Sequence, residues 1–394
     1  MLAQRVSAFF ELQDAASARW LPMEGLRGFA VALVFLVHFA DFVKPYSDAG
    51  WLNALHEIGN VGVDLFFVLS GFLIYKSCIR RPINVRLYAW RRIERIYPAF
   101  LAAFAIYLAL MILIPSQSKL PDEAGETVTY ILSNLLFLPG MLSIEPIMTV
   151  AWSLSYEVFF YLPVPLAIIG LRMRLWRPDQ RLVFFLALYA AMIAVEISGF
   201  GGRFRLSMFL GGMMLYEILA LRPAERRRAS ALSDLLALGA VGAAFALYAL
   251  LASDPVVVDS PLSGALPPVT RIVLINVAFV ILVYRSVFTE GPAAAAFSWT
   301  PLRWLGNISY SFYLMHGLGL HGMFMILGKL WRPDEMGVAA FALLLPVAFA
   351  ASLAASLPIY LLIERPLSLG AGFKPKSATA GQAPPSGIVG RISR

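Results

Sequence analysis

Residues 26–43 read LRGFAVALVFLVHFADFV, and this stretch decides the fold class. Its apolar run approaches the ~20 residues that cross a hydrocarbon core of about 30 Å as a helix. The run carries Arg27 near its start and His38 eleven residues later. Because a helix rises about 1.5 Å per residue, we expect these two side chains to lie roughly 16 Å apart along the axis. One helix would therefore carry a cation at one face of the membrane and an imidazole deep within it.

The composition of the whole chain agrees with a membrane-embedded protein. Of its 394 residues, 59% are hydrophobic and 14% are charged, and the mean hydropathy is +0.74. Soluble proteins have roughly 45–50% apolar and about 25% charged residues. The little polar surface that remains excludes an intrinsically disordered chain, a secreted disulfide scaffold and a nucleic-acid-binding domain. A single cysteine, Cys78, cannot form an intrachain disulfide, and four histidines suggest no metal cluster, so we expect no metal.

Apolar stretches of similar length recur along the chain, separated by charged or Pro/Gly-rich loops. We predict an all-α polytopic membrane protein with about ten transmembrane helices, at residues 26–43, 58–75, 96–114, 149–171, 182–198, 206–221, 232–252, 269–286, 305–327 and 338–363. A shorter stretch, 127–141, is expected to be an interfacial or re-entrant helix. The membrane domain would cover residues 26–366, between a cytoplasmic N-terminal segment, 1–25, and a flexible basic cytoplasmic tail, 367–394.

The positive charges predict how the helices are oriented. The chain has 32 Lys and Arg residues and a net charge of +8. With ten crossings both termini face the same side, and most of these basic residues fall in segments on that side. They include the pair Arg80-Arg81 and the group at 172–181. Because Lys and Arg concentrate in cytoplasmic loops, we predict that both termini are cytoplasmic, in a bacterial cytoplasmic (inner) membrane.

Four ionisable side chains fall inside the predicted spans, where a charge costs about 2.5–3.5 kcal/mol on insertion scales. His38, Asp64 and Glu157 are expected at similar depth in the outer halves of three helices, and His316 near the middle of another. Such residues are candidates for one buried polar site. In this site, Asp64 or Glu157 would orient the imidazole of His38, which acts as a general base. Each residue alone is also compatible with a structural hydrogen bond between helices.

Six arginines and three aromatic residues fall in the segment 80–98, RRPINVRLYAWRRIERIYP. Arg92 and Arg95 are three residues apart and therefore share one face of a helix. Guanidinium groups in this arrangement are suited to binding phosphates. The same segment also fits a positive-inside signal that contacts anionic lipids, and charge alone does not separate the two interpretations.

Taken together, several segments resemble acyltransferase family 3, the integral-membrane O-acyltransferases. MEGLRGFAVALVFLVHF is similar to the first helix of the family, and RRIERIYPAF supplies its Arg-x-x-Arg. AWSLSYEVFFYLPVP resembles the family's Trp-Ser-Leu-x-x-Glu region, while NISYSFYLMHG and IERP are similar to its last two motifs. The resemblance extends over residues 23–366, in order. The residues that match these motifs are Arg27, His38, Arg92, Arg95, Trp152, Ser153, Glu157, Tyr310 and His316.

The resemblance implies transfer of an acyl group, commonly acetyl from acetyl-CoA, to a hydroxyl of a carbohydrate or lipid-linked glycan on an exported or surface polysaccharide. His38 would be the general base or a transient acyl carrier. The expected catalytic residues are His38, Asp64 and Glu157. The residues expected to bind the phosphates of acyl-CoA are Arg27, Arg92 and Arg95, and those expected to support the substrates are Trp152, Ser153, Tyr310 and His316.

The main alternative from another class is a secondary transporter or lipid-linked glycan flippase, in which buried His and carboxylate groups relay protons or bind substrate. A transporter would move its substrate across sealed vesicles without consuming acyl-CoA. The expected partners of an enzyme are acyl-CoA, a hydroxyl acceptor and membrane lipid. The sequence leaves open the acceptor, the acyl chain length, the oligomeric state and the choice between direct transfer and an acyl-His38 intermediate.

Overall fold

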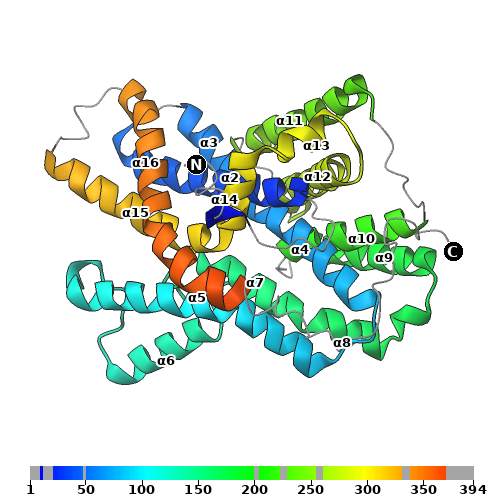
Figure 1. The fold of residues 1–394 in the computed structure, drawn as a ribbon, viewed down its shortest axis with the longest axis horizontal. Helices are drawn as coiled ribbons and strands as arrows, with labels where there is room; N and C mark the ends of the chain where they lie inside the picture. Colours follow the sequence, from blue (N-terminus) through cyan, green and yellow to red (C-terminus); the bar gives the residue numbers. More distant parts are fainter. Residues whose placement is uncertain are drawn as a thin grey trace, which may run out of the picture.

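The computed structural model describes residues 9–11, 21–47, 50–198, 204–221, 229–253, 261–330 and 338–369. These residues are almost entirely helical and form no β-strand, which confirms the all-α prediction (Figure 1). The helices are α2 (Leu21–Val43), α3 (Gly50–Asn60), α4 (Gly62–Ile79), α5 (Val85–Leu113), α6 (Ala124–Leu135), α7 (Ala151–Tyr161), α8 (Pro163–Gly170), α9 (Pro178–Ile197), α10 (Ser207–Leu221), α11 (Ala231–Ser253), α12 (Pro261–Val287), α13 (Pro292–Phe297), α14 (Thr300–Asn307), α15 (Ser309–Leu330) and α16 (Val338–Ile359). A π-helical segment, η6 (Tyr360–Leu369), continues α16, and 3-10 turns occur at η1 (Lys44–Tyr46), η2 (Pro115–Gln117), η3 (Met173–Leu175) and η4 (Phe204–Leu206).

Within the described residues, 9 helical stretches are long and apolar enough to cross a membrane. They coincide with all the predicted spans except 305–327. That stretch forms most of α15, which has 22 residues but includes two histidines that lower its hydropathy. The weak stretch 127–141 forms most of α6, a helix of 12 residues that is not among the candidate spans. Most of the predicted N-terminal segment, and the tail beyond residue 369, lie outside the described residues.

Two of the predicted spans are interrupted. The second breaks at Val61, between α3 and α4, and the fourth breaks at Leu162, between α7 and α8. Pro163 follows the second break directly, and a proline cannot donate the backbone hydrogen bond that would continue a helix. These breaks lie near two of the candidate residues, because Asp64 is in the first turn of α4 and Glu157 is in α7.

Helix α2 lies at the centre of the fold, in contact with α3, α4, α14 and α15 (Figure 1). Its approach to α14 is very close, since a Cβ atom added to Gly28 would lie 2.0 Å from the backbone oxygen of Leu302. A Cβ atom added to Gly306 of α14 would lie 1.8 Å from the backbone oxygen of Glu24. Only glycine permits these contacts, so the two helices hold each other in one register beside Arg27.

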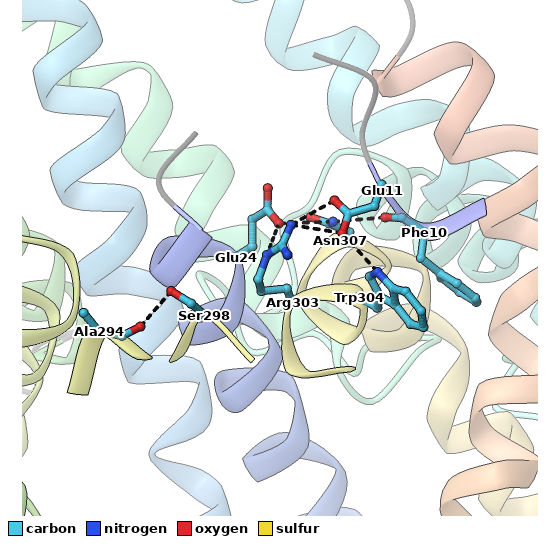
Figure 2. A network of polar contacts seen from close by, with 8 residues as sticks. All are labelled: Phe10, Glu11, Glu24, Ala294, Ser298, Arg303, Trp304 and Asn307. Atoms are coloured by element: carbon cyan, nitrogen blue, oxygen red, sulfur yellow. Dashed lines mark hydrogen bonds and ion pairs between the residues drawn. The ribbon is translucent and has the colours of Figure 1, made fainter. Parts of the chain in front are cut away.

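Next to this contact, a polar network joins the described N-terminal residues to α2 and α14 (Figure 2). Arg303, whose side chain is buried, forms ion pairs with Glu11 at 2.8 Å and with Glu24 at 3.1 Å. Asn307 donates a hydrogen bond to the backbone oxygen of Phe10 at 3.0 Å, and the Phe10 ring stacks on Trp304. Three segments that are far apart in the sequence are thus tied together one turn before Arg27.

Candidate active site

The three arginines singled out in the sequence line one cavity of about 140 Å³, which we call the arginine cavity. Arg27 comes from α2, and Arg92 and Arg95 come from α5. Other polar residues of its lining are Ser70, Ser153, Glu157, Tyr161, Ser309, Tyr310 and Tyr313. The structure therefore brings together side chains that are up to 286 residues apart in the sequence, from residue 27 to residue 313.

Arg92 contributes a buried, unpaired hydrogen-bond donor beside two tyrosine rings. Its guanidinium lies 5.0 Å from the ring centre of Tyr88 and 5.1 Å from that of Tyr161. Its Nε atom is buried and has no hydrogen-bond partner among the described residues. A buried donor left unpaired is costly, so a ligand that accepts a hydrogen bond here would be favoured. Arg27 donates instead to the Ser309 hydroxyl, at 3.0 Å.

Glu157 lies in the arginine cavity, where it accepts hydrogen bonds from Ser70 at 3.2 Å and from Tyr161 at 2.5 Å. Both partners line the arginine cavity, whereas His38 lines a different cavity. The prediction that Glu157 orients His38 is therefore wrong. Three guanidinium groups face this one carboxylate in the lining of the cavity, so positive charge is in excess. Such an excess is suited to phosphate groups.

A second cavity, of about 430 Å³, contains His38 in its wall. We call it the histidine cavity, and its walls come mainly from α2, α5, α15 and the loop before α7. Residues from these four elements include His38, Tyr107, Met111, Val150, His321 and Met325. His321 was not among the candidate site residues, although it lies in the same wall as His38.

The carboxylate beside His38 is Asp41, one turn further along the same helix. Its Oδ2 atom lies 3.8 Å from His38 Nδ1, and its Oδ1 atom lies 2.7 Å from His56 Nδ1. The sequence analysis missed Asp41, although residues three apart on a helix are neighbours. His38 also contacts His316, with 5.1 Å between the ring centres.

His316 is fully buried, and its Nδ1 atom lies 3.0 Å from the backbone oxygen of Phe312. A carbonyl oxygen only accepts hydrogen bonds, so Nδ1 carries the proton of this imidazole and Nε2 is the acceptor. Nε2 has no partner among the described residues. An unpaired acceptor therefore lies on the ring that contacts His38.

Asp64 is bound elsewhere. Its side chain is 1% exposed and accepts two hydrogen bonds from Arg205, at 2.7 Å and 3.1 Å. The Arg205 guanidinium in turn lies 5.3 Å from the ring centre of Trp152. The prediction that Asp64 orients His38 is wrong, because Arg205 occupies both of its carboxylate oxygens. Asp64 instead holds Arg205 against the first turn of α7.

The walls of the two cavities are in contact at three residues, which we call the threshold: Val150, Ser153 and Tyr313. Ser153 and Tyr313 line the arginine cavity, and Val150 lines the histidine cavity. The Tyr313 hydroxyl lies 2.5 Å from the Ser153 hydroxyl and donates to the backbone oxygen of Val150 at 3.0 Å. Tyr313 also contacts His316, with 6.1 Å between the ring centres. Continuous contacts thus lead from the arginine cavity to His38.

Among the described residues, no group of three or more His, Cys, Asp or Glu side chains is arranged to hold a metal ion. The guanidinium groups of the arginine cavity are suited to binding an anion, and the imidazole of His38 is suited to transferring a proton.

A profile described as an acyltransferase domain matches residues 21–361. The chain belongs to acyltransferase family 3. This match confirms the resemblance noted in the sequence.

The chain is similar to three proteins, among others, that have curated descriptions. O-acetyltransferase OatA of Staphylococcus aureus is 26% identical over 336 residues, covering 78% of this chain and 52% of the relative. The putative membrane-bound transacylase BcsY of Komagataeibacter xylinus is 34% identical over 148 residues, 35% of this chain and 34% of the relative. Acyltransferase MdmB of Streptomyces mycarofaciens is 33% identical over 150 residues, 36% of this chain and 38% of the relative. The match thus spans about half the length of OatA, and no solved structure is significantly similar to the chain.

Proposed function

We propose that this protein is a membrane O-acyltransferase that moves an acyl group, acetyl in the simplest case, from cytoplasmic acyl-CoA to a hydroxyl of a carbohydrate or lipid-linked glycan. The observation that carries the proposal is the threshold. There the wall of the cavity with three guanidinium groups contacts the wall of the cavity with the imidazole of His38. The family and the descriptions of its relatives as acetyltransferase, transacylase and acyltransferase support it.

The donor occupies the arginine cavity. Arg92 and Arg95 bind the phosphates of acyl-CoA, since a guanidinium group donates parallel hydrogen bonds to phosphate oxygens. Arg27, fixed by Ser309 and by the contact between α2 and α14, adds a third positive charge. The arm that ends in the thioester then extends to the threshold. Donor entry from the cytoplasm depends on the predicted orientation of the helices.

The acceptor hydroxyl binds in the histidine cavity. His38 removes its proton, and the oxygen attacks the thioester carbonyl carbon. As the new C–O bond forms, the C–S bond breaks, and the CoA thiolate takes the proton from His38. Asp41 stabilises the imidazolium, as the third member of a catalytic triad does. If the acyl group is first carried by His38, a ring nitrogen attacks the thioester carbon and the C–S bond breaks. The acceptor oxygen then forms the C–O bond as the C–N bond to His38 breaks, and the proton of the acceptor ends on the CoA thiolate.

A labelled-donor assay tests this proposal. Purified protein in lipid nanodiscs, supplied with radiolabelled acetyl-CoA and a glycan-containing lipid extract, should transfer label to the extract. His38→Ala should lower the rate about a hundredfold or more, because general base catalysis contributes roughly 10²–10⁴. Ile326→Ala, at a position that is 62% exposed on the same helix as His316, is the control and should keep the rate. Retained transfer by His38→Ala would remove this residue from the chemistry, and transport without donor consumption would favour a transporter.

A further inference from the structure

The lining of the histidine cavity indicates which kind of acceptor fits it. Resting on the proposed function, we infer that the acceptor is an amphiphile, whose hydroxyl lies at His38 and whose alkyl or isoprenoid chain lies in the histidine cavity between α5 and α15. A free, fully water-soluble sugar would be a poor acceptor. This inference concerns the part of the acceptor that does not react.

The lining of the histidine cavity is mainly apolar. The walls contributed by α5 and α15 include Leu110, Met111, Leu318 and Met325, and Ile114 directly follows α5. The described lining contains no carboxylate, arginine or tryptophan. A free sugar loses hydrogen bonds to water when it binds, so its site must replace them with several polar groups. An alkyl chain needs no such partners and gains free energy from the burial of its apolar surface.

Polar groups of this lining already form contacts within the protein. Lys119 forms an ion pair with Glu145 at 2.8 Å and donates to the backbone oxygen of Pro146. The Tyr107 hydroxyl donates to the backbone oxygen of Leu314 at 3.5 Å. His321 packs its ring edge-on against Phe42, with 6.0 Å between the ring centres. What this wall offers a bound molecule is therefore mainly apolar contact beside the imidazoles of His38 and His321.

The histidine cavity lies beside apolar side chains that are exposed on the surface of the helices. Met325 lines the cavity and is 42% exposed, and its neighbour Ile326 is 62% exposed. On the opposite wall, Leu113, which precedes the lining residue Ile114, is 75% exposed. Large exposed apolar side chains on membrane-spanning helices face lipid tails. An acceptor chain can therefore enter from the bilayer, with its polar head near Gln117 and Thr149 in the loops that line the cavity.

The size of the cavity agrees with such a ligand. Its volume of about 430 Å³ lies in the range of small-molecule sites, roughly 300–1,000 Å³, and is about three times that of the arginine cavity. Gly322 lines it on α15, and a Cβ atom added there would meet no atom within 4 Å. Gly322→Leu therefore adds bulk at the cavity wall without a clash at its Cβ atom. Gly328, on the same helix and also in open space, provides the matched control Gly328→Leu.

Photolabelling tests the binding independently of catalysis. The protein in nanodiscs is labelled with a diazirine-bearing long-chain alcohol, and the labelled peptides are identified by mass spectrometry. We expect preferential labelling of peptides from α5 and α15, at least fivefold weaker labelling in Gly322→Leu, and less than a twofold change in Gly328→Leu. Octyl glucoside should compete with the probe, and methyl glucoside should not. Labelling that is spread over the lipid-facing helices and unaffected by Gly322→Leu would overturn the inference.

A transfer assay separates this inference from the proposed function. Octyl and methyl glucoside offer the same hydroxyls, so the wild-type enzyme should prefer the octyl compound by at least a hundredfold in kcat/KM, and Gly322→Leu should reduce this preference at least tenfold. Equal transfer to both would refute the amphiphile while the acyltransferase stands. Specific labelling without transfer to any acceptor would refute the acyltransferase while the binding site stands. If Gly322→Leu changes instead the choice between acetyl-CoA and octanoyl-CoA, the cavity holds the donor chain and the inference is wrong.

Discussion

Arg92 is the side chain whose surroundings most clearly require a ligand. Its guanidinium lies 5.0 Å and 5.1 Å from the ring centres of two tyrosines, and its Nε atom is buried without a partner among the described residues. Arg91, its neighbour in the sequence, is exposed and does not line the cavity. The two positions therefore separate a specific contact from general positive charge on this part of α5.

Arg92→Ala should weaken binding of acetyl-CoA about tenfold to a hundredfold. A hydrogen bond to a charged group contributes about 1.5–3 kcal/mol, and tenfold corresponds to about 1.4 kcal/mol. Arg91→Ala should change the dissociation constant less than threefold, because an exposed charge is screened by salt. Equilibrium binding of labelled acetyl-CoA to protein in nanodiscs gives both values. Equal effects of the two substitutions would assign the segment to topology or lipid contact.

The Tyr313 hydroxyl narrows the passage at the threshold. Tyr313→Phe removes the contact with Ser153 and the hydrogen bond to Val150, so this passage should widen. More water could then reach the thioester from the histidine cavity. We expect the ratio of donor hydrolysis to acyl transfer to rise roughly threefold or more, since closed sites protect reactive intermediates from water. Released CoA and labelled product, measured together, give this ratio; an unchanged ratio would show that the hydroxyl does not limit the access of water.

The partners of His38 show which part of a buried site a sequence can reveal. Distance along a helix follows from residue number, so the depths of His38, Asp64 and Glu157 could be compared before the structure. The direction in which each side chain points depends on how the helices are rotated and packed. Arg205, which lies in a predicted loop, therefore forms an ion pair with Asp64, and Glu157 lines the arginine cavity. The contact between Asp41 and His38 could have been predicted from their i,i+3 spacing.

At the scale of the helices, the contact between α2 and α14 positions Arg27. Gly28→Ala would place a methyl group 2.0 Å from a backbone oxygen that cannot move independently of α14. We expect destabilisation of about 2 kcal/mol or more, in the range of overpacked cores, and a lower midpoint of thermal unfolding in detergent. Gly239→Ala in α11 meets nothing within 4 Å, so it should be neutral or slightly stabilising, because alanine favours helix more than glycine does. Equal melting of the two variants would contradict the close packing.

The helices themselves could largely be predicted, because an apolar stretch of sufficient length has few alternatives in a membrane. The break before Pro163 had a local signal, since proline ends helices. The break at Val61 had none, because GNVGVDLFF contains glycines that are also tolerated within a helix. The merging of α16 into a π-helical segment depends on packing and was likewise inaccessible.

For the whole molecule, the predicted orientation assigns the two ends of α5 to opposite sides of the membrane. Arg91 near its start should be cytoplasmic, and Gln117 after its end should face outward. The native Cys78 is 1% exposed, so single cysteines can be introduced without strong background labelling. On intact cells, a membrane-impermeant maleimide should label Gln117→Cys at least fivefold more than Arg91→Cys, and permeabilisation should remove the difference. The reverse pattern would place the arginine cavity on the outer side and rule out a cytoplasmic donor.

In the proposed mechanism, the arginine cavity binds the donor and the histidine cavity performs proton transfer. The most direct measurement determines, on the same nanodisc samples, the dissociation constant of acetyl-CoA and the single-turnover rate of acyl transfer for wild type and His38→Gln. We predict that the dissociation constant stays within about threefold, while the transfer rate falls about a hundredfold or more. A variant that binds the donor poorly, or that transfers the acyl group at the wild-type rate, would contradict the claim.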